Sequence, residues 1–149
     1  MFARSGYVAA MGDAQKVSAA IIVSGGLVLL TRRARGEKLA GHWEFPGGKL
    51  EDGESLQRCV EREIHEELGV SCIAGGQIAS SLYNYEGGAI ELIAIHVEAT
   101  SHDFTLSVHD AVAWVDPATA AKDYMLAPAD IPLAQDVAVW LAAHQQQAE

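Results

Sequence analysis

The sequence predicts a single α/β (α+β) domain in which a mixed β-sheet lies between helices. Three observations predict it: pairs of β-rich runs around glycine turns, a helix with an apolar stripe between those pairs, and an amphipathic helix near the C-terminus. A chain of 149 residues is long enough for one domain with its own core. We expect residues 17–149 to form this domain, and residues 1–16 to be a disordered tail without the apolar stretch of a signal peptide.

Four β-rich runs are joined in pairs by Gly-Gly turns, which predicts two hairpins. The first pair is residues 17–23 with 27–31, and the second is residues 78–85 with 89–99. A short apolar strand is expected later in the chain, over residues 111–115.

One helix is expected after the first hairpin, and two helical regions are expected after the second. The first lies between Ser55, a good N-cap, and Gly69, which suits the left-handed residue after a helix. Its apolar residues recur at helical spacing and predict one buried side: Leu56, Cys59, Val60, Ile64 and Leu68. Asp116-Pro117 is a plausible start for a second helical region, and residues 133–144 form the closing amphipathic helix.

Three glutamates lie beside the buried side of the first helix. At about 100° per residue, Glu63 and Glu67 border the apolar stripe, Glu66 lies just beyond, and the exposed face centres on basic and polar residues such as Arg62. An i,i+4 pair of like charges costs roughly 0.2–0.5 kcal/mol even when exposed. Mg²⁺ would relieve this repulsion, because it binds carboxylate oxygens and substrate phosphates. The alternative, a solvated acidic face, fits poorly because the exposed positions are basic and polar.

The loop before the helix is suited to approach a ligand with its backbone. Pro46 fixes its own φ, while Gly47 and Gly48 permit a tight turn. Arg62 is expected to pair with a neighbouring carboxylate and hold it in place, the alternative being a plain surface ion pair. Glu54 opens the helix, where negative charge suits the dipole.

This stretch of sequence resembles the signature of the Nudix hydrolases, which cleave nucleoside diphosphates linked to another group. The matching positions are Gly48, Glu54, Arg62, Glu63, Ile64, Glu66, Glu67, Gly69 and Val70. The resemblance implies the Nudix fold, a structural role for Glu54, and Mg²⁺, with Mn²⁺ as a substitute. It implies that the metal ligands are Glu63, Glu66, Glu67 and the carbonyl of Gly47.

Three further segments resemble the MutT-like branch of that family and, within it, the bacterial CTP pyrophosphohydrolases. They are Thr31-Arg32-Arg33, residues 43–48 and residues 126–132. The resemblance implies hydrolysis of nucleoside triphosphates, including modified or oxidised ones, to a monophosphate and pyrophosphate. Glu66 or Glu63 is the expected base that takes a proton from water. The biological role implied is sanitising the nucleotide pool or controlling a pyrimidine triphosphate.

The same segments contain the candidate substrate-binding residues. Arg33 offers a forked donor to a phosphate, unless it is only an exposed arginine at a strand end. Glu44 and Asp130 are candidates to accept hydrogen bonds from a base. Asp130 stands where enzymes for oxidised guanine have an asparagine, so the cytosine amine is a natural partner; a purine amine would also serve, and a helix-cap or turn role is the alternative. Phe45 and Tyr83 either stack on the base or pack in the core.

The resemblance fails at one position. Relatives usually have an acidic residue in the loop before Trp114, where this chain has Val108 followed by His109 and Asp110. Asp110 would substitute if the loop shifts, and His109 is a candidate base near neutral pH. Otherwise the glutamates of the helix suffice.

Composition limits the partners. With 10 basic and 20 acidic residues the formal net charge is −10, which argues against nucleic acid polymers and anionic membranes and favours a small nucleotide bound through metal ions. Cys59 and Cys72 are expected to be reduced core thiols of a cytoplasmic protein, a monomer or a homodimer. Two functional alternatives remain: a Nudix hydrolase for ADP-ribose or dinucleoside polyphosphates, and a non-catalytic nucleotide-sensing module.

Overall fold

The computed structural model describes residues 14–148, so the predicted N-terminal tail lies outside the described residues up to residue 13. The strands are β2 (Gln15–Ile21), β3 (Val23–Ser24), β4 (Leu27–Arg33), β5 (Trp43–Glu44), β6 (Cys72–Tyr85), β7 (Gly88–Ala99) and β8 (His109–Val115). The helices are α1 (Leu56–Leu68), α2 (Ala120–Asp123) and α3 (Asp130–Ala148). No helix among these is long and apolar enough to cross a membrane.

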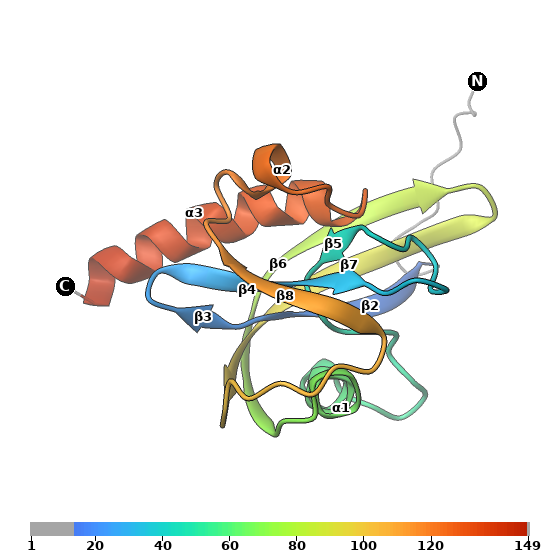
Figure 1. Cartoon of the computed structure of the whole chain (residues 1–149), viewed down its shortest axis with the longest axis horizontal. Coiled ribbons are helices and arrows are strands. Elements are labelled where there is room, and N and C mark those ends of the chain that lie inside the picture. Colours follow the sequence, from blue (N-terminus) through green and yellow to red (C-terminus); the bar gives the residue numbers. More distant parts are fainter. Residues whose placement is uncertain (1–13, 149) are drawn as a thin grey trace.

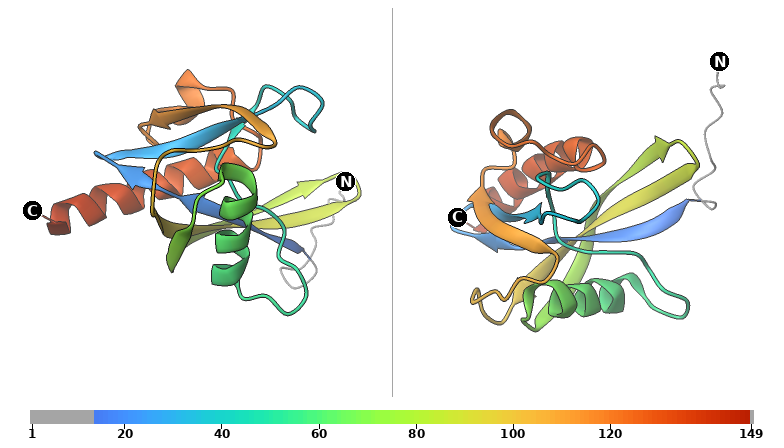
Figure 2. Two further views of the ribbon diagram at one scale, coloured as in Figure 1. Left: turned by 60° about the horizontal axis from the view of Figure 1, so that its bottom comes forward. Right: turned by 45° about the vertical axis from the view of Figure 1, so that its right-hand side comes forward.

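Two small sheets form the middle of the molecule, with α1 on one side and α3 on the other (Figures 1 and 2). In the first sheet, β7 lies between a parallel β2 and an antiparallel β6, so this sheet is mixed. In the second, β4 pairs antiparallel with β3, β5 and β8. The predicted arrangement, mixed strands between helices, is therefore confirmed.

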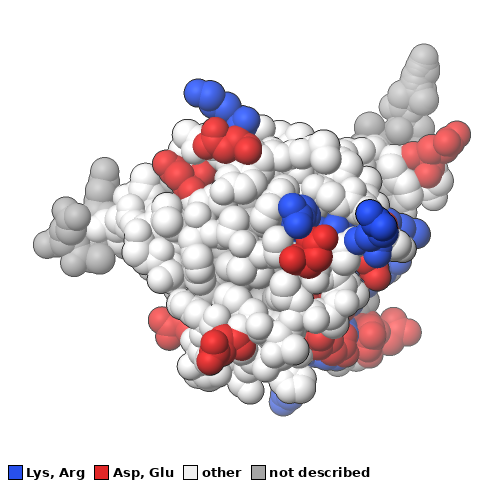
Figure 3. Space-filling model, in the orientation of Figure 1, with Lys and Arg blue, Asp and Glu red and all other residues white. Residues whose placement is uncertain are grey.

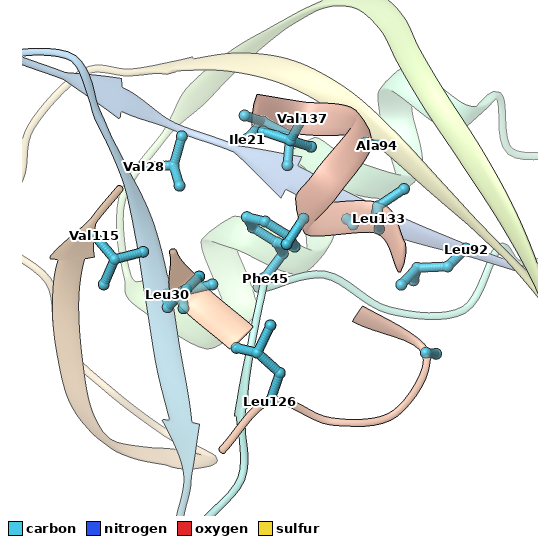
Figure 4. Packing of buried hydrophobic residues seen from close by; sticks show 14 of the residues in the cluster. Ile21, Val28, Leu30, Phe45, Leu92, Ala94, Val115, Leu126, Leu133 and Val137 are labelled. Atoms are coloured by element: carbon cyan, nitrogen blue, oxygen red, sulfur yellow. The ribbon is translucent and has the colours of Figure 1, made fainter. Parts of the chain in front are cut away.

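Each side of the sheets has its own hydrophobic cluster, because the central strands point alternate side chains to opposite faces. Ala19 and Ile21 of β2 pack in the cluster under α3, whereas Ala20 of the same strand packs against α1. Phe45 lies inside the α3 cluster, near Leu133 of α3 (Figure 4). A strand buried on both faces is apolar at successive positions, which explains the continuous apolar run that predicts β2.

The first predicted hairpin is wrong in part. The run expected as one strand is divided between the two sheets: β2 pairs in parallel with β7, and only β3 forms the hairpin with β4 across the glycine turn. β2 also begins at Gln15, two residues earlier than expected, because Gln15 pairs with Ile90. The partner that decides this pairing comes from a distant part of the chain, so the local pattern does not show it.

The later strands and the closing helix are confirmed with longer boundaries, whereas the helical region predicted to start at Asp116-Pro117 is only the short helix α2, which begins at Ala120. β6 and β7 form the second hairpin, but β6 starts at Cys72 and tolerates a register shift between Ala74 and Gln77, where two glycines lie. α3 begins at Asp130, three residues before the predicted start. The two-residue strand β5 has no predicted counterpart; it exists because Trp43 and Glu44 pair with β4.

Candidate active site

Helix α1 is fixed by its caps and by its apolar stripe. The Ser55 hydroxyl accepts a hydrogen bond from the amide of Arg58, and Gly69 takes the left-handed conformation (φ 69°) after the last turn, both as predicted. Cys59, Val60, Ile64 and Leu68 are buried. The helix backbone is therefore held against the sheet, and its glutamates emerge at the edge of that contact.

The loop of residues 46–48 is pinned to β2. The amides of Ala20 and Ser18 donate to the carbonyls of Pro46 (2.7 Å) and Gly48 (2.8 Å). The Gly47 carbonyl between them receives no hydrogen bond from the described residues. A Cβ on Gly47 would collide with the backbone of Ser18, so this close approach requires glycine. The loop thus presents one free carbonyl beside α1.

Glu67 joins helix α1 to this loop. Its Oε1 accepts a hydrogen bond from the Gly47 amide at 3.2 Å. Burial raises the pKa of Glu67 to about 8, and the negative charges of Glu63 and Glu44 add to the effect. Burial likewise raises the pKa of Glu63, against the opposing charge of Arg62. Both carboxyls lie where negative charge is costly, and a bound cation would reverse that cost.

Arg62 is the centre of a carboxylate network rather than a plain surface pair. Its Nε donates to Glu54 (2.6 Å), its Nη1 donates to Glu63 (3.1 Å) and Glu66 (3.2 Å), and its Nη2 donates to the carbonyl of Lys49 (3.2 Å). These hydrogen bonds hold the pKa of Glu54 at about 2 and raise that of the arginine. The acidic side chains of this region gather at the lower right of the surface view (Figure 3).

The oxygen atoms of the candidate metal ligands suit a hard divalent cation, but the glutamate side chains bond to different partners in this structure. Glu63, Glu66, Glu67 and the Gly47 carbonyl offer only oxygen, which Mg²⁺ prefers. Across residues 14–148, no three acidic, histidine or cysteine side chains are grouped closely enough to enclose a metal ion. Glu63 and Glu66 bind Arg62, while Glu67 binds the Gly47 amide. Bringing the glutamates together requires side-chain rotations on one fixed helix.

If Glu63 and Glu66 are metal ligands, Arg62→Lys is expected to weaken Mg²⁺ binding by about 10–100-fold, the usual effect of removing a residue that orients such ligands. Lysine keeps the charge but has no fork to bind several carboxylates at once. The measurement is the Mg²⁺ concentration that gives half-maximal activity, with a Mn²⁺ titration as a direct binding readout. Arg58→Lys, an exposed arginine on the same helix, is the matched control. If Arg62→Lys needs the same Mg²⁺ concentration for half-maximal activity as the wild type, the hydrogen bonds of Arg62 serve only the stability of the fold.

A cavity of about 330 Å³ lies beside the same loop and has mostly apolar walls, a size typical of small-molecule pockets. Apolar and aromatic residues form much of its wall: Leu39, Phe45, Tyr83, Tyr85, Ile90, Leu92 and Pro128. Glu44, Gly47 and Asp130 also line it. Gly47 belongs both to the cavity wall and to the contact with Glu67. The cavity and helix α1, the glutamate helix that bears Glu63, Glu66 and Glu67, therefore meet at Gly47.

Asp130 reaches the cavity through tertiary contacts. The backbone of Trp43 bonds to Met125 and Ala127 (both 2.8 Å), which docks the segment before α3 onto β5. The buried Asp130 carboxyl then accepts a hydrogen bond from the Phe45 amide at 3.0 Å. Burial raises its pKa to about 8, helped by the charge of Glu44. Asp130 is the first residue of α3, but its side chain bonds to Phe45, the residue after β5, and not to its own helix.

The side chain of Arg33 forms hydrogen bonds within the protein. It donates to Glu44 (3.3 Å), to Glu37 (3.4 Å) and to the carbonyl of Lys38 (2.9 Å). It is therefore not an exposed arginine at a strand end, and binding a phosphate would require it to release some of these contacts.

The positions near the expected extra acid have other partners. Asp110 forms a surface ion pair with Arg32 at 2.7 Å. His109 is buried and lies 2.9 Å from the second carboxylate oxygen of Glu44. The pairing of β4 with both β5 and β8 creates this contact, so the sequence gives no signal for it.

Comparisons with known proteins agree with this fold and site. The NUDIX domain family matches residues 14–137. The CTP pyrophosphohydrolase of Escherichia coli is 42% identical over 118 residues, covering 79% of this chain and 87% of that protein. A putative 8-oxo-dGTP diphosphatase 2 of Mycobacterium tuberculosis is 36% identical over 121 residues, covering 78% and 82%. The solution structure of the E. coli ORF135 protein matches with a TM-score of 0.76 at 38% identity, covering 88% of this chain and 93% of that one.

The fold and the glutamate helix thus define a hydrolase of nucleoside diphosphate derivatives, and the chain belongs to the Nudix family. Within that family it is of the MutT-like type, with the CTP pyrophosphohydrolases among its relatives.

Proposed function

We propose that this protein hydrolyses nucleoside triphosphates, including modified or oxidised ones, to a monophosphate and pyrophosphate with Mg²⁺, as a sanitiser of the nucleotide pool. The observation that supports this most is the meeting of two features at Gly47: the glutamate helix on one side and an apolar cavity on the other. A substrate with its base in the cavity would extend its phosphates towards Glu63, Glu66 and Glu67. The names of the two relatives, one acting on CTP and one on 8-oxo-dGTP, agree with this substrate class. Cytoplasmic location and a monomeric or homodimeric state are part of the same proposal.

The residues have distinct roles in this mechanism. Glu63, Glu66, Glu67 and the Gly47 carbonyl would hold Mg²⁺, which when bound neutralises phosphate charge and makes a water more acidic. Arg62 orients Glu63 and Glu66 through its hydrogen bonds. Glu66 or Glu63 takes the proton of the attacking water, and the Glu66 side chain is the more accessible of the two, at 56% exposed against 14% for Glu63. The water then attacks a phosphorus of the triphosphate in line, and the phosphoanhydride bond between the α- and β-phosphates breaks, which gives a monophosphate and pyrophosphate.

Base recognition is assigned to the two carboxyls of the cavity. Asp130 has a pKa of about 8 and holds a proton at neutral pH, so it donates as well as accepts a hydrogen bond. Glu44 as a carboxylate only accepts. Cytosine has a ring nitrogen acceptor beside its amino donor, and these two groups complement an acid and a carboxylate. Phe45 and Tyr83 in the cavity wall provide aromatic surface for the base.

Pyrophosphate release from a panel of triphosphates tests the proposal directly. The panel contains CTP, dCTP, 5-methyl-dCTP, 8-oxo-dGTP and the ordinary purine nucleotides, each with Mg²⁺ and with or without a chelator; ADP-ribose is assayed for AMP. Chelator-sensitive release from one triphosphate in preference to the others supports the proposal. Activity on ADP-ribose alone would make this a Nudix hydrolase for another substrate class. No hydrolysis of any compound in the panel would favour a non-catalytic nucleotide sensor.

Asp130→Asn is expected to change the pH dependence of the base ranking more than the maximal rate. Asparagine keeps an acceptor for the Phe45 amide and has an NH₂ donor that cannot lose its proton, so at every pH the pocket presents the donor–acceptor pattern that Asp130 presents only while it is protonated. In the wild type, cytosine preference should weaken as pH rises through about 8, because the protonated form of Asp130 is lost there. The measurement is kcat/KM for CTP divided by kcat/KM for 8-oxo-dGTP, from about pH 6.5 to about pH 9.5 in steps of roughly half a pH unit. A ratio that depends on pH in the same way in both proteins would restrict Asp130 to a structural role.

A further inference from the structure

His109 holds one oxygen of Glu44 from inside the protein. Its side chain is 0% exposed, and its Nε2 lies 2.9 Å from Glu44 Oε2. Arg33 Nη1 lies 3.3 Å from the same oxygen. Glu44 thus receives two side-chain donors on Oε2, while Oε1 has no recorded partner among the described residues.

The protonation of the imidazole follows from its surroundings. A carboxylate oxygen only accepts, so Nε2 must carry the hydrogen. The other ring nitrogen, Nδ1, is buried and has no partner among residues 14–148. The hydrogen bond from Nε2 to Glu44 is therefore the one polar contact of the ring among these residues.

Three strands cooperate to place this contact. β5 and β8 lie on opposite sides of β4, and they supply Glu44 and His109. The β4–β8 register shifts between Arg32 and Arg33, so that Arg33 pairs with His109 while Asp110 stays at the surface with Arg32. The backbone of Glu44 is fixed as well, since Thr31 Oγ1 donates to its carbonyl at 3.0 Å.

We propose that His109 is a positioning residue for substrate recognition: it anchors Oε2 of Glu44 so that Oε1 remains directed to the cavity as a hydrogen-bond acceptor for the base. This inference rests on the proposed function, in which Glu44 contacts the base. It assigns His109 no proton transfer, because a ring without solvent exposure does not reach a water that attacks phosphorus. The histidine becomes the principal anchor when Arg33 turns towards a phosphate, since the two residues share the same oxygen.

His109→Leu tests the anchor, and His109→Gln is the conservative variant, because a glutamine amide can donate to Glu44 from a similar distance. For the preferred triphosphate, His109→Leu should raise KM about 10-fold, the value of one hydrogen bond to a charged group, with kcat nearly unchanged. It should also reduce the preference among bases, and His109→Gln should restore most of both. Val112→Thr, at an exposed position of the same strand β8, should leave both as in the wild type.

A double-mutant cycle with Glu44→Ala separates positioning from general packing. In the Glu44→Ala background, His109→Leu should have little further effect on KM or base preference. An equal loss of activity for every base, or the same loss in both backgrounds, would overturn the proposal and leave His109 a core residue.

A measurement without turnover distinguishes this inference from failure of the proposed function. The ring ¹⁵N signals of His109 should show a proton on Nε2, and Glu44→Ala should shift or broaden that signal. If the wild type hydrolyses no triphosphate, the proposed function fails whatever the NMR result. Ring signals that show no Nε2 proton, or that are unaffected by Glu44→Ala, would overturn the anchor itself, whatever the enzyme hydrolyses.

Discussion

Glu67→Gln is expected to abolish Mg²⁺-dependent turnover and, at the same time, to make the metal-free protein more stable at alkaline pH. Loss of a ligand from a phosphate-binding metal site removes several kcal/mol of charge stabilisation, on the order of 10³-fold in rate. Glutamine keeps the shape of the side chain and can still accept the hydrogen bond of the Gly47 amide. The fold should therefore survive the change.

The gain in stability follows from the raised pKa of Glu67, about 8 against an ordinary value near 4.5. Between these values the unfolded chain has lost the proton and the folded chain retains it, so wild-type stability falls with rising pH. The slope for one such group is at most about 1.4 kcal/mol per pH unit. Glutamine has no proton to lose, so the advantage of the variant should grow from about pH 4.5 and level off above about pH 8.

Denaturant unfolding at several pH values, in a chelator, measures this difference. Glu61→Gln on the same helix is a suitable control, because Glu61 bonds to the amide of Ala74 and lies outside the glutamate site. Full activity of Glu67→Gln with Mg²⁺ would remove Glu67 from the metal ligands. An equal pH dependence of stability in the wild type and the variant would show that the carboxyl is not buried as described.

Gly47→Ala is expected to damage both the fold and the site, whereas Gly48→Ala should damage chiefly the site. A Cβ on Gly47 meets the backbone of Ser18 in β2, so the strand or the loop must move. Overpacking of this kind typically costs about 1–3 kcal/mol. A Cβ on Gly48 meets the carboxyl group of Glu63, the end of a flexible side chain, which can rotate away at little cost to the backbone. That rotation would displace a proposed metal ligand.

Thermal unfolding and Mg²⁺-dependent activity distinguish the two glycines. Gly47→Ala should lower the unfolding temperature and the activity together, and Gly48→Ala should lower activity with a nearly normal unfolding temperature. Gly53→Ala tests the cost of a backbone change nearby, since a Cβ there has open space although the residue has a positive φ. Normal stability of Gly47→Ala would contradict the close contact between the loop and β2.

Helix α1 shows which structural features can be predicted from residues close together in the sequence. Its caps, its buried stripe and the placement of Glu63 and Glu67 beside that stripe all depend on residues within a few positions of one another. The spacing therefore predicts them, and it also supports the resemblance that identifies the family. Strand β2 shows the limit: its apolar run predicts a strand, but not that the strand leaves the hairpin to pair with β7.

The sequence by itself determined the class of the protein and the helix that bears its acids, because periodicity, capping and motif spacing are local properties. The tertiary structure alone decided which distant side chains share a pocket. Asp130 binds the Phe45 amide and His109 binds Glu44 only because sheet register and core packing bring these segments together. Such contacts depend on the packing of the whole chain, and no short stretch of sequence encodes them.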